Sequence, residues 1–134
     1  MSVKASPYQA YEQTSVTTAT PGELTLLLYD GCLKFIRAGR QAILTGNMDA
    51  KNTNLQKAQR IMQELMATLN MDVEIAKNMY SLYDYINRRL IEANMQVNTE
   101  LLDEVEGLVA DFRNTWKQVI QLNRKPVKAQ GRQV

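Results

Sequence analysis

One stretch of the chain, residues 20–36, most constrains what it can fold into: it reads TPGELTLLLYDGCLKFI. Thr20 suits the N-cap of a helix, Pro21 suits the first helical position, and Glu23 can complete a capping box with Thr20. On a helical wheel the charged and amide residues fall on one narrow seam, and almost everything else is apolar. A helix that faces the core of a small bundle needs an apolar stripe of only roughly 100°, so this helix carries more apolar surface than one core uses.

Two interpretations of this surplus apolar surface stay open. Neighbouring helices of the same chain could bury it, or it could form a groove for a partner segment. The pattern alone favours burial within the chain.

Three further segments have apolar residues at spacings of three and four, and turn-forming residues separate them. We expect the first helix to end at Leu44, before Gly46, and Asn47 to cap the second. Asp72 is expected to cap a third helix that ends near Met95, and Asn98 or Thr99 to start a fourth that ends near Leu122. Four helices, each about 35 Å long and joined by short turns, predict an all-α fold, an antiparallel up-down four-helix bundle.

Both ends of the chain are expected to lie outside this bundle. Residues 1–19 are predicted to form a mobile N-terminal arm, in which one short helical turn would place Tyr8 and Tyr11 on one face. These rings could tuck onto the body or dock a partner. Residues 123–134 are basic, have no apolar period, and are predicted to be a disordered tail. The expected organisation is an arm over 1–19, a bundle over 20–122 and a tail over 123–134.

Length, charge and hydropathy limit the class of protein. A chain of 134 residues suits one domain with a single core. Its net charge of +2 indicates neither a nucleic-acid groove nor a polybasic membrane surface. The N-terminus has no apolar stretch of signal-peptide length, and no run of about 18 apolar residues could span a bilayer. We therefore expect a cytoplasmic protein without nucleic-acid partners or stable membrane insertion.

Catalytic and metal-binding chemistry is not expected. The chain has no histidine and a single cysteine, Cys32, which removes the usual ligands of zinc and di-iron sites and the commonest general base. No glycine-rich phosphate loop occurs. Cys32 lies inside the apolar helix and is expected to be a buried structural thiol. The sequence predicts no enzyme, no cofactor and no metal.

The third segment also carries more apolar surface than a core needs, because Tyr85 lies beyond its main stripe. Arg88 is expected to pair with Asp84 one turn earlier. Arg89 lies at the edge of the stripe, where it could stack on a ring within the fold or present its guanidinium to a partner carboxylate. An apolar surplus on two helices, together with seven methionines, is typical of proteins that bind an amphipathic partner helix in a groove.

Four stretches resemble the flagellin-specific export chaperone family, FliS, in the order found in that family. They read PYQAYEQTSVTTATPGEL, TLLLYDGCLKFI, LYDYINRRLIEAN and LLDEVEGLVADFRNTWKQ. The resemblance covers the arm and most of three helices, whereas the second helix and the tail match less well.

The resemblance implies a bacterial cytoplasmic chaperone that binds the C-terminal segment of flagellin and prevents premature polymerisation. It also implies delivery of that segment to the flagellar type III export gate, through the cytoplasmic domain of the gate protein FlhA. In this family the N-terminal arm can cover part of the surface that binds the cargo. No catalytic residue and no cofactor come with the family.

Eight residues are our candidates for partner binding. Tyr8 and Tyr11 of the arm are expected to compete for part of the groove, and the wheel does not separate core from contact residues among the other six: Leu24, Leu27, Leu28, Tyr29, Tyr85 and Arg89. The alternative function is a structural or regulatory helical bundle that self-associates through the same apolar face, with a homodimer as its free form.

Overall fold

The computed structural model describes residues 20–133, and four helices account for almost all of them. These helices are α2 (Pro21–Leu44), α3 (Met48–Ala67), α4 (Glu74–Gln96) and α5 (Thr99–Gln133). The predicted arm, with Tyr8 and Tyr11, lies outside the described residues.

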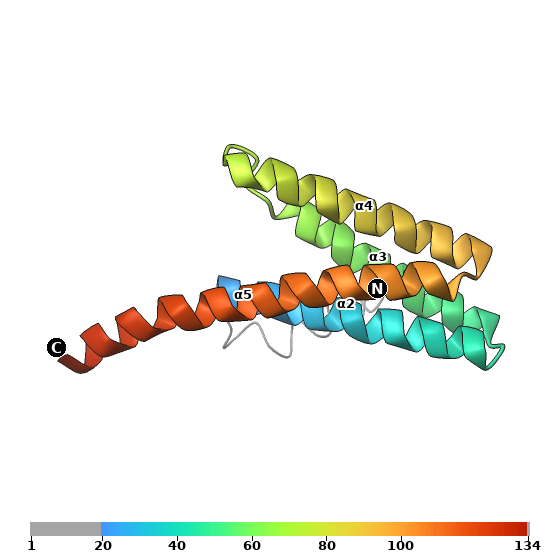
Figure 1. Ribbon diagram of the computed structural model, residues 1–134, viewed down its shortest axis with the longest axis horizontal. Helices are drawn as coiled ribbons and strands as arrows, with labels where there is room; N and C mark the ends of the chain where they lie inside the picture. Colours follow the sequence, from blue (N-terminus) through green and yellow to red (C-terminus); the bar gives the residue numbers. More distant parts are fainter. Residues whose placement is uncertain (1–19, 134) are drawn as a thin grey trace, which may run out of the picture.

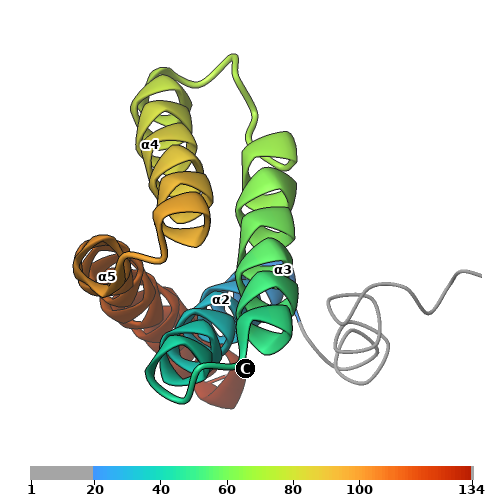
Figure 2. The ribbon, with the colours of Figure 1, turned by 90° about the vertical axis from the view of Figure 1, so that its right-hand side faces the viewer.

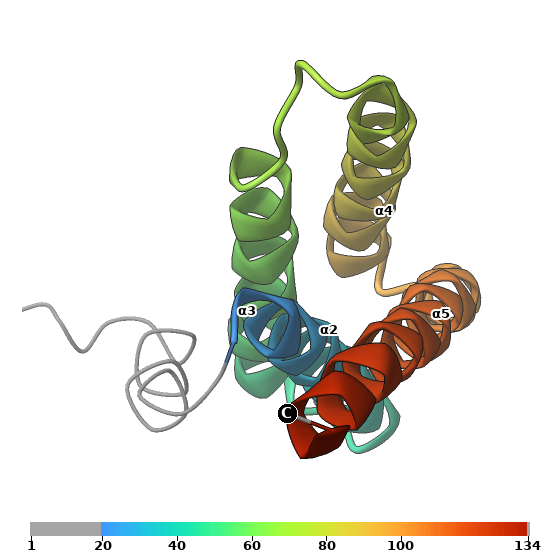
Figure 3. The same cartoon turned by 90° about the vertical axis from the view of Figure 1, so that its left-hand side faces the viewer.

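The four helices form an up-down bundle in which α2 packs against α3 and α5, and α4 packs against the same two helices (Figures 1 and 2). This confirms the predicted fold class. Figures 1 and 3 show that α4 separates from α5 with increasing distance from the turn that joins them. The bundle is therefore closed at one end of this helix pair and open at the other.

Local capping explains where α2 and α3 begin. The Thr20 hydroxyl accepts a hydrogen bond from Glu23 N, and the Glu23 carboxylate accepts one from Thr20 N, both at 3.1 Å, so the predicted capping box is confirmed. Asn47 Oδ1 accepts from Ala50 N at 3.0 Å, which confirms Asn47 as the cap of α3.

The start of α4 differs from the prediction. Val73 is its N-cap, and no side chain caps the helix there. Asp72 instead donates its backbone N–H to Asn70 Oδ1 at 3.1 Å, a local turn that holds it one residue too early to cap. The prediction of Asp72 as a cap was wrong. At the next turn the prediction is confirmed, because Asn98 Oδ1 accepts from the first backbone N–H groups of α5.

The end of α5 also differs from the prediction. The helix continues past Leu122 to Gln133 and extends beyond the other helices in Figure 1. The predicted end of this helix at Leu122 is therefore wrong, whereas the division of the chain into arm, bundle and tail stays a prediction. The segment 123–133 contains two Arg, two Lys and two Gln, which favour helix, but also Pro126 and Gly131, which disfavour it, so its residue types do not explain the extension.

All four helices contribute to one core. Cys32 is fully buried with its Sγ 3.9 Å from Ala58 O, and burial raises the pKa of its thiol to about 12, as expected of a structural cysteine. The largest fully buried side chains are Tyr29, Ile36, Leu55, Ile61, Met62, Leu65, Tyr83, Ile86, Leu90, Leu102, Val105 and Val109.

A buried lysine fastens the closed end of the bundle. Lys51 of α3 is 6% exposed, and its ammonium group donates to Asn94 O at 2.8 Å. Asn94 lies in the last turn of α4, where backbone carbonyls lack intrahelical partners and a positive charge is favourable. This contact joins α3 to α4 close to the turn that leads into α5.

Candidate partner-binding cleft between α4 and α5

Polar contacts hold α5 against α2 along much of its length. Arg37 Nε donates to Glu106 at 2.6 Å, and Arg40 bridges Glu106 and Asp103. Burial alone would raise the pKa of Glu106, but the hydrogen bonds from Arg37 and Arg40 outweigh it and lower the pKa.

The same α2–α5 contact continues toward the N-terminus of α2. Arg113 Nε donates to Asp30 at 2.7 Å, and Trp116 Nε1 donates to Gly22 O at 2.8 Å. The two helices are thus joined from Arg40 near one end of α2 to Gly22 near the other.

The contact between α4 and α5 is polar only near their shared turn. The Tyr85 hydroxyl donates to Glu104, and Arg89 Nε lies 3.3 Å from the same carboxylate. Arg89 also donates to Glu92 at 2.8 Å, and its Cζ lies 5.4 Å from the centre of the Tyr85 ring. Arg89 thus contacts groups of the fold itself, and its role toward a partner stays a prediction.

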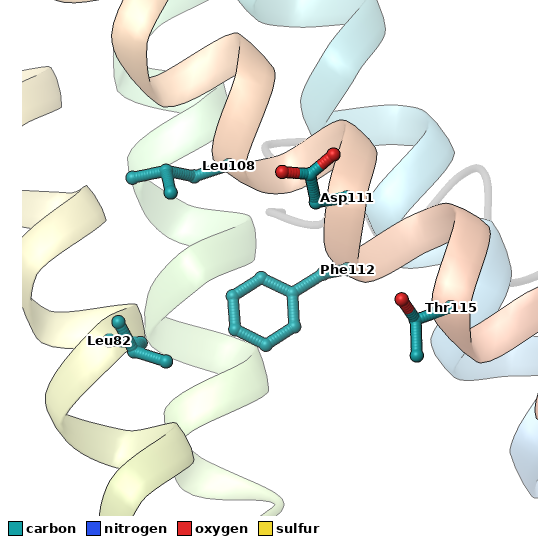
Figure 4. A pocket seen from close by; sticks show the side chains of 5 residues that line it. All are labelled: Leu82, Leu108, Asp111, Phe112 and Thr115. Atoms are coloured by element: carbon teal, nitrogen blue, oxygen red, sulfur yellow. The ribbon is translucent and has the colours of Figure 1, made fainter.

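Beyond Tyr85 the two helices separate, and a cleft of about 310 Å³ lies between them. Figure 4 shows Leu108 and Phe112 extending from α5 toward the side on which Leu82 of α4 lies, with Asp111 and Thr115 along the α5 edge. Leu82 is 44% exposed. The cleft therefore has apolar walls and a short polar edge.

One of the residues that line the cleft, Phe112, belongs to a cluster of three aromatic rings. The Phe112 ring stacks on Tyr29 at a centroid distance of 6.0 Å and lies 5.4 Å from the Tyr83 ring. The hydroxyls of Tyr29 and Tyr83 are 2.5 Å apart and hydrogen-bonded to each other. Burial raises the pKa of both tyrosines, so both hydroxyls stay protonated at neutral pH.

Apolar side chains are also exposed around the N-terminal half of α4. A second hollow, of about 210 Å³, lies on its α3 side and is lined by Gln63, Met66, Ala67 and Tyr80. Five exposed large apolar residues fall within residues 71–82: Met71, Val73, Ile75, Tyr80 and Leu82. Such a concentration is typical of an interaction surface rather than of scattered surface residues.

The structure separates the sequence-predicted candidates into core and surface. Leu28 and Tyr29 are buried in the core, Leu24 and Leu27 are half-buried, and Tyr85 pairs with Glu104 and Arg89. Arg88 pairs with Asp84 at 3.0 Å, as expected. None of the described candidates lines the cleft.

Five residues that line the cleft were absent from the candidates: Leu82, Leu108, Asp111, Phe112 and Thr115. The broad apolar surface of the third predicted helix pointed to α4, but Leu82 and Phe112 were not among the candidates because each lies on the apolar stripe of its own helix. These residues line a cleft because α4 separates from α5, and the spacing of apolar residues in the sequence does not show that separation.

The described residues lack two other kinds of site. No group of three or more His, Cys, Asp or Glu side chains there could hold a metal ion. Nor does any described helix combine the length and the hydropathy needed to cross a membrane.

Comparison with known proteins gives consistent matches. A protein-family model described as "Flagellar protein FliS" matches residues 4–123. The flagellar secretion chaperone FliS of Bacillus subtilis (strain 168) is 56% identical over 126 residues, which cover 94% of this chain and 95% of the relative. The flagellar secretion chaperone FliS of Salmonella typhimurium (strain LT2) is 37% identical over 122 residues, covering 86% and 90%.

A solved structure supports the fold. It is described as the crystal structure of a flagellar chaperone from bacteria, and it superposes with a TM-score of 0.71 at 22% identity. The match covers 85% of this chain and 94% of the other. The family has a non-enzymatic role, in agreement with the prediction of no enzyme. From the family match and the two relatives, the chain belongs to the FliS family of flagellar secretion chaperones.

Proposed function

We propose that this protein is a cytoplasmic export chaperone that holds the C-terminal segment of flagellin in the cleft between α4 and α5. Binding prevents premature polymerisation of flagellin. The chaperone then helps to deliver its cargo to the flagellar type III export gate, through the cytoplasmic domain of FlhA. Family membership and the resemblance in the sequence support this assignment of cargo and gate.

The observation that carries the proposal is the apolar surface exposed where α4 leaves α5. Leu82 is 44% exposed and lines the cleft with the half-buried Leu108 and Phe112, and Ile75, two turns earlier on α4, is 60% exposed. Each Å² of apolar surface removed from water contributes about 25 cal/mol, so an amphipathic helix that covers these side chains gains affinity from its own apolar stripe.

The free energy gained from the contact must offset the free-energy cost of ordering the cargo. A segment that is disordered when free loses about 2 to 5 kcal/mol or more on folding against its partner. The cleft alone accommodates few side chains, so the exposed apolar residues 71–82 provide the additional area. A segment held in this way cannot present the same apolar stripe to another flagellin subunit, which explains how binding prevents polymerisation.

Calorimetric titration tests the proposal directly, with a peptide covering about the last 40 residues of flagellin from the same organism. We expect one-to-one binding, a negative heat-capacity change, and new helical signal in circular dichroism. No binding by the full-length chain would contradict the proposed cargo.

A matched pair of variants tests the location of binding. Leu82→Ser removes an apolar wall of the cleft, whereas Leu44→Ser changes a leucine that is 68% exposed at the closed end of the bundle. We expect Leu82→Ser to weaken binding about tenfold and Leu44→Ser to leave it unchanged. Equal effects would place the cargo elsewhere.

The same exposed face would also serve self-association, the alternative function. Light scattering of the free chain over a range of concentrations distinguishes the two. A mass that rises with concentration and does not respond to the peptide favours a self-associating bundle, whereas a monomer converted to a one-to-one complex favours the chaperone.

A further inference from the structure

The carboxylates of α5 differ in how their charge is neutralised. Of the five, three are paired with arginines of neighbouring helices: Asp103 with Arg40, Glu106 with Arg37 and Arg40, and Glu104 with Arg89. A fourth, Glu100, lies in the first turn, where the N-terminal end of the helix favours a negative charge. The fifth is Asp111.

Asp111 makes no ion pair or hydrogen bond with any residue in the part of the chain that the structure describes. The positions three and four residues away on α5 are Gly107, Leu108, Asn114 and Thr115, and none is cationic. The nearby Arg113 is bonded to Asp30 on the opposite side of α5. The bundle therefore leaves this exposed carboxylate without a neutralising partner.

The position of this carboxylate connects it with the cleft. Asp111 lines the cleft together with Leu108, Phe112 and Thr115, so its negative charge stands beside the apolar walls (Figure 4). A helix that inserts apolar side chains between Leu82 and Phe112 presents the residues one turn away to this edge. An acidic residue there would be repelled by Asp111, whereas a lysine or arginine would be attracted.

We propose that the occupant of the cleft is an amphipathic helical segment with a lysine or arginine three or four positions from its apolar anchor, and that Asp111 pairs with this residue. This inference rests on the proposed function and adds a determinant of specificity to it. The apolar walls provide affinity, and Asp111 fixes which turn of the bound helix enters the cleft. Arginine suits the role better than lysine, because its planar guanidinium binds a carboxylate through two hydrogen bonds.

Charge variants with a matched control test the pairing in the full-length chain. Asp111→Asn and Asp111→Lys are compared with Asp49→Asn and Asp49→Lys. Asp49 is also an exposed aspartate without an ion pair among the described residues, but it lies in the first turn of α3, at the closed end of the bundle. The probe is the flagellin C-terminal peptide, and the readouts are the dissociation constant, the association rate and their dependence on salt.

We expect Asp111→Asn to weaken binding about two- to fivefold and to flatten the salt dependence, because the lost pair lies at the edge of the contact. Charge reversal in Asp111→Lys should weaken binding by about tenfold or more, mainly through a slower association rate. The Asp49 variants should bind as the wild type does. Circular dichroism of each variant checks that the bundle is intact.

Exchange of charge between the partners makes the test specific. Each Lys or Arg of the peptide is replaced by Glu in turn, and we expect one of these peptides to bind Asp111→Lys better than it binds the wild type. If the wild type binds the peptide but the Asp111 and Asp49 variants behave alike and no peptide restores Asp111→Lys, this inference is overturned while the proposed function stands. If the wild type does not bind the peptide at all, the proposed function itself fails.

Discussion

Helix α5 packs against α2 on one side and against α4 on the other, and the two contacts are built differently. Toward α2, hydrogen bonds run from Arg40–Asp103 near one end to Trp116–Gly22 near the other. Toward α4, the polar contacts of Tyr85 and Arg89 with Glu104 are confined to the region near the shared turn. Helix α5 is thus joined to α2 by polar contacts along most of α2, but to α4 only near their shared turn.

The difference teaches how a small bundle can be stable and still expose apolar surface. The ion pairs between α2 and α5 hold that side together, and α4 contributes to the core through one face, which includes Tyr83. Residues such as Ile75 and Leu82 can then remain exposed without unfolding the rest. The following variants test this division, from the largest expected effect to the smallest.

Truncation of a leucine should affect stability very differently in the core and in the cleft. Leu55 is fully buried, whereas Leu82 is 44% exposed in the cleft. We expect Leu55→Ala to lower the free energy of unfolding by about 3 kcal/mol, and Leu82→Ala by less than about 1 kcal/mol. Urea denaturation measures both values. Equal losses would show that the cleft side contributes as much stability as the core.

The buried pair of Tyr29 and Tyr83, which contacts Phe112, should tolerate loss of both hydroxyls better than loss of one. In Tyr83→Phe the buried Tyr29 hydroxyl loses its only hydrogen-bond partner among the described residues, so we expect a loss of about 1 to 3 kcal/mol. The double variant Tyr29→Phe with Tyr83→Phe leaves no unpaired hydroxyl and should recover part of this. Denaturation of the three proteins tests the order, and a double variant less stable than Tyr83→Phe would contradict it.

Substitution of two helical glycines by alanine should change the stability of the protein in opposite directions. A Cβ at Gly39 of α2 would lie 2.5 Å from Cδ2 of the fully buried Leu55, whereas a Cβ at Gly107 of α5 would meet nothing within 4 Å. We expect Gly39→Ala to destabilise the protein by about 1 to 2 kcal/mol through overpacking. Gly107→Ala should stabilise it by up to about 1 kcal/mol, since alanine favours helix. Thermal denaturation of both variants provides the comparison.

The smallest expected effect concerns how the contribution of Glu106, at the contact between α2 and α5, to stability depends on pH. The pKa of Glu106 is lowered from its ordinary value of 4.5 in the folded state, so its ion pairs contribute stability that is fully present above that value and is lost as the pH falls through the lowered pKa. We expect Glu106→Gln to be less stable than the wild type by about 1 kcal/mol or less at pH 7.

This difference should shrink as the pH falls through the lowered pKa, where Glu106 becomes protonated in the wild type as well. Urea denaturation at several pH values follows it. A difference that stays constant from pH 7 to strongly acidic pH would show that charge at Glu106 does not contribute.

Much of the fold could be predicted because its boundaries depend on neighbouring residues. The caps at Thr20 and Asn47 form hydrogen bonds three residues along the chain, so the residue types and their spacing were sufficient. The prediction failed at Asp72, where Asn70 forms a competing turn, and at Leu122, beyond which α5 continues to Gln133 although Pro126 and Gly131 disfavour helix.

The cleft could not be predicted because it depends on the angle between two helices. A wheel gives the direction of a side chain around its own helix, but not whether another helix covers that direction. Ile75 lies on the apolar stripe of α4 and is nevertheless 60% exposed, whereas Tyr29, a candidate for partner binding, is 1% exposed. Arg89 was left open for the same reason, since its partner Glu104 comes from another helix.

The single cysteine, buried between α2 and α3, allows opening of the bundle to be measured by the rate at which its thiol is modified. Cys32 is protonated and inaccessible in the native state, so a thiol reagent modifies it only when the bundle opens. A partner that binds the native state lowers the population of opened molecules in proportion to its saturation. The rate of thiol modification in the unaltered chain therefore measures how far a partner saturates the proposed binding site, without a dye, a tag or an engineered residue.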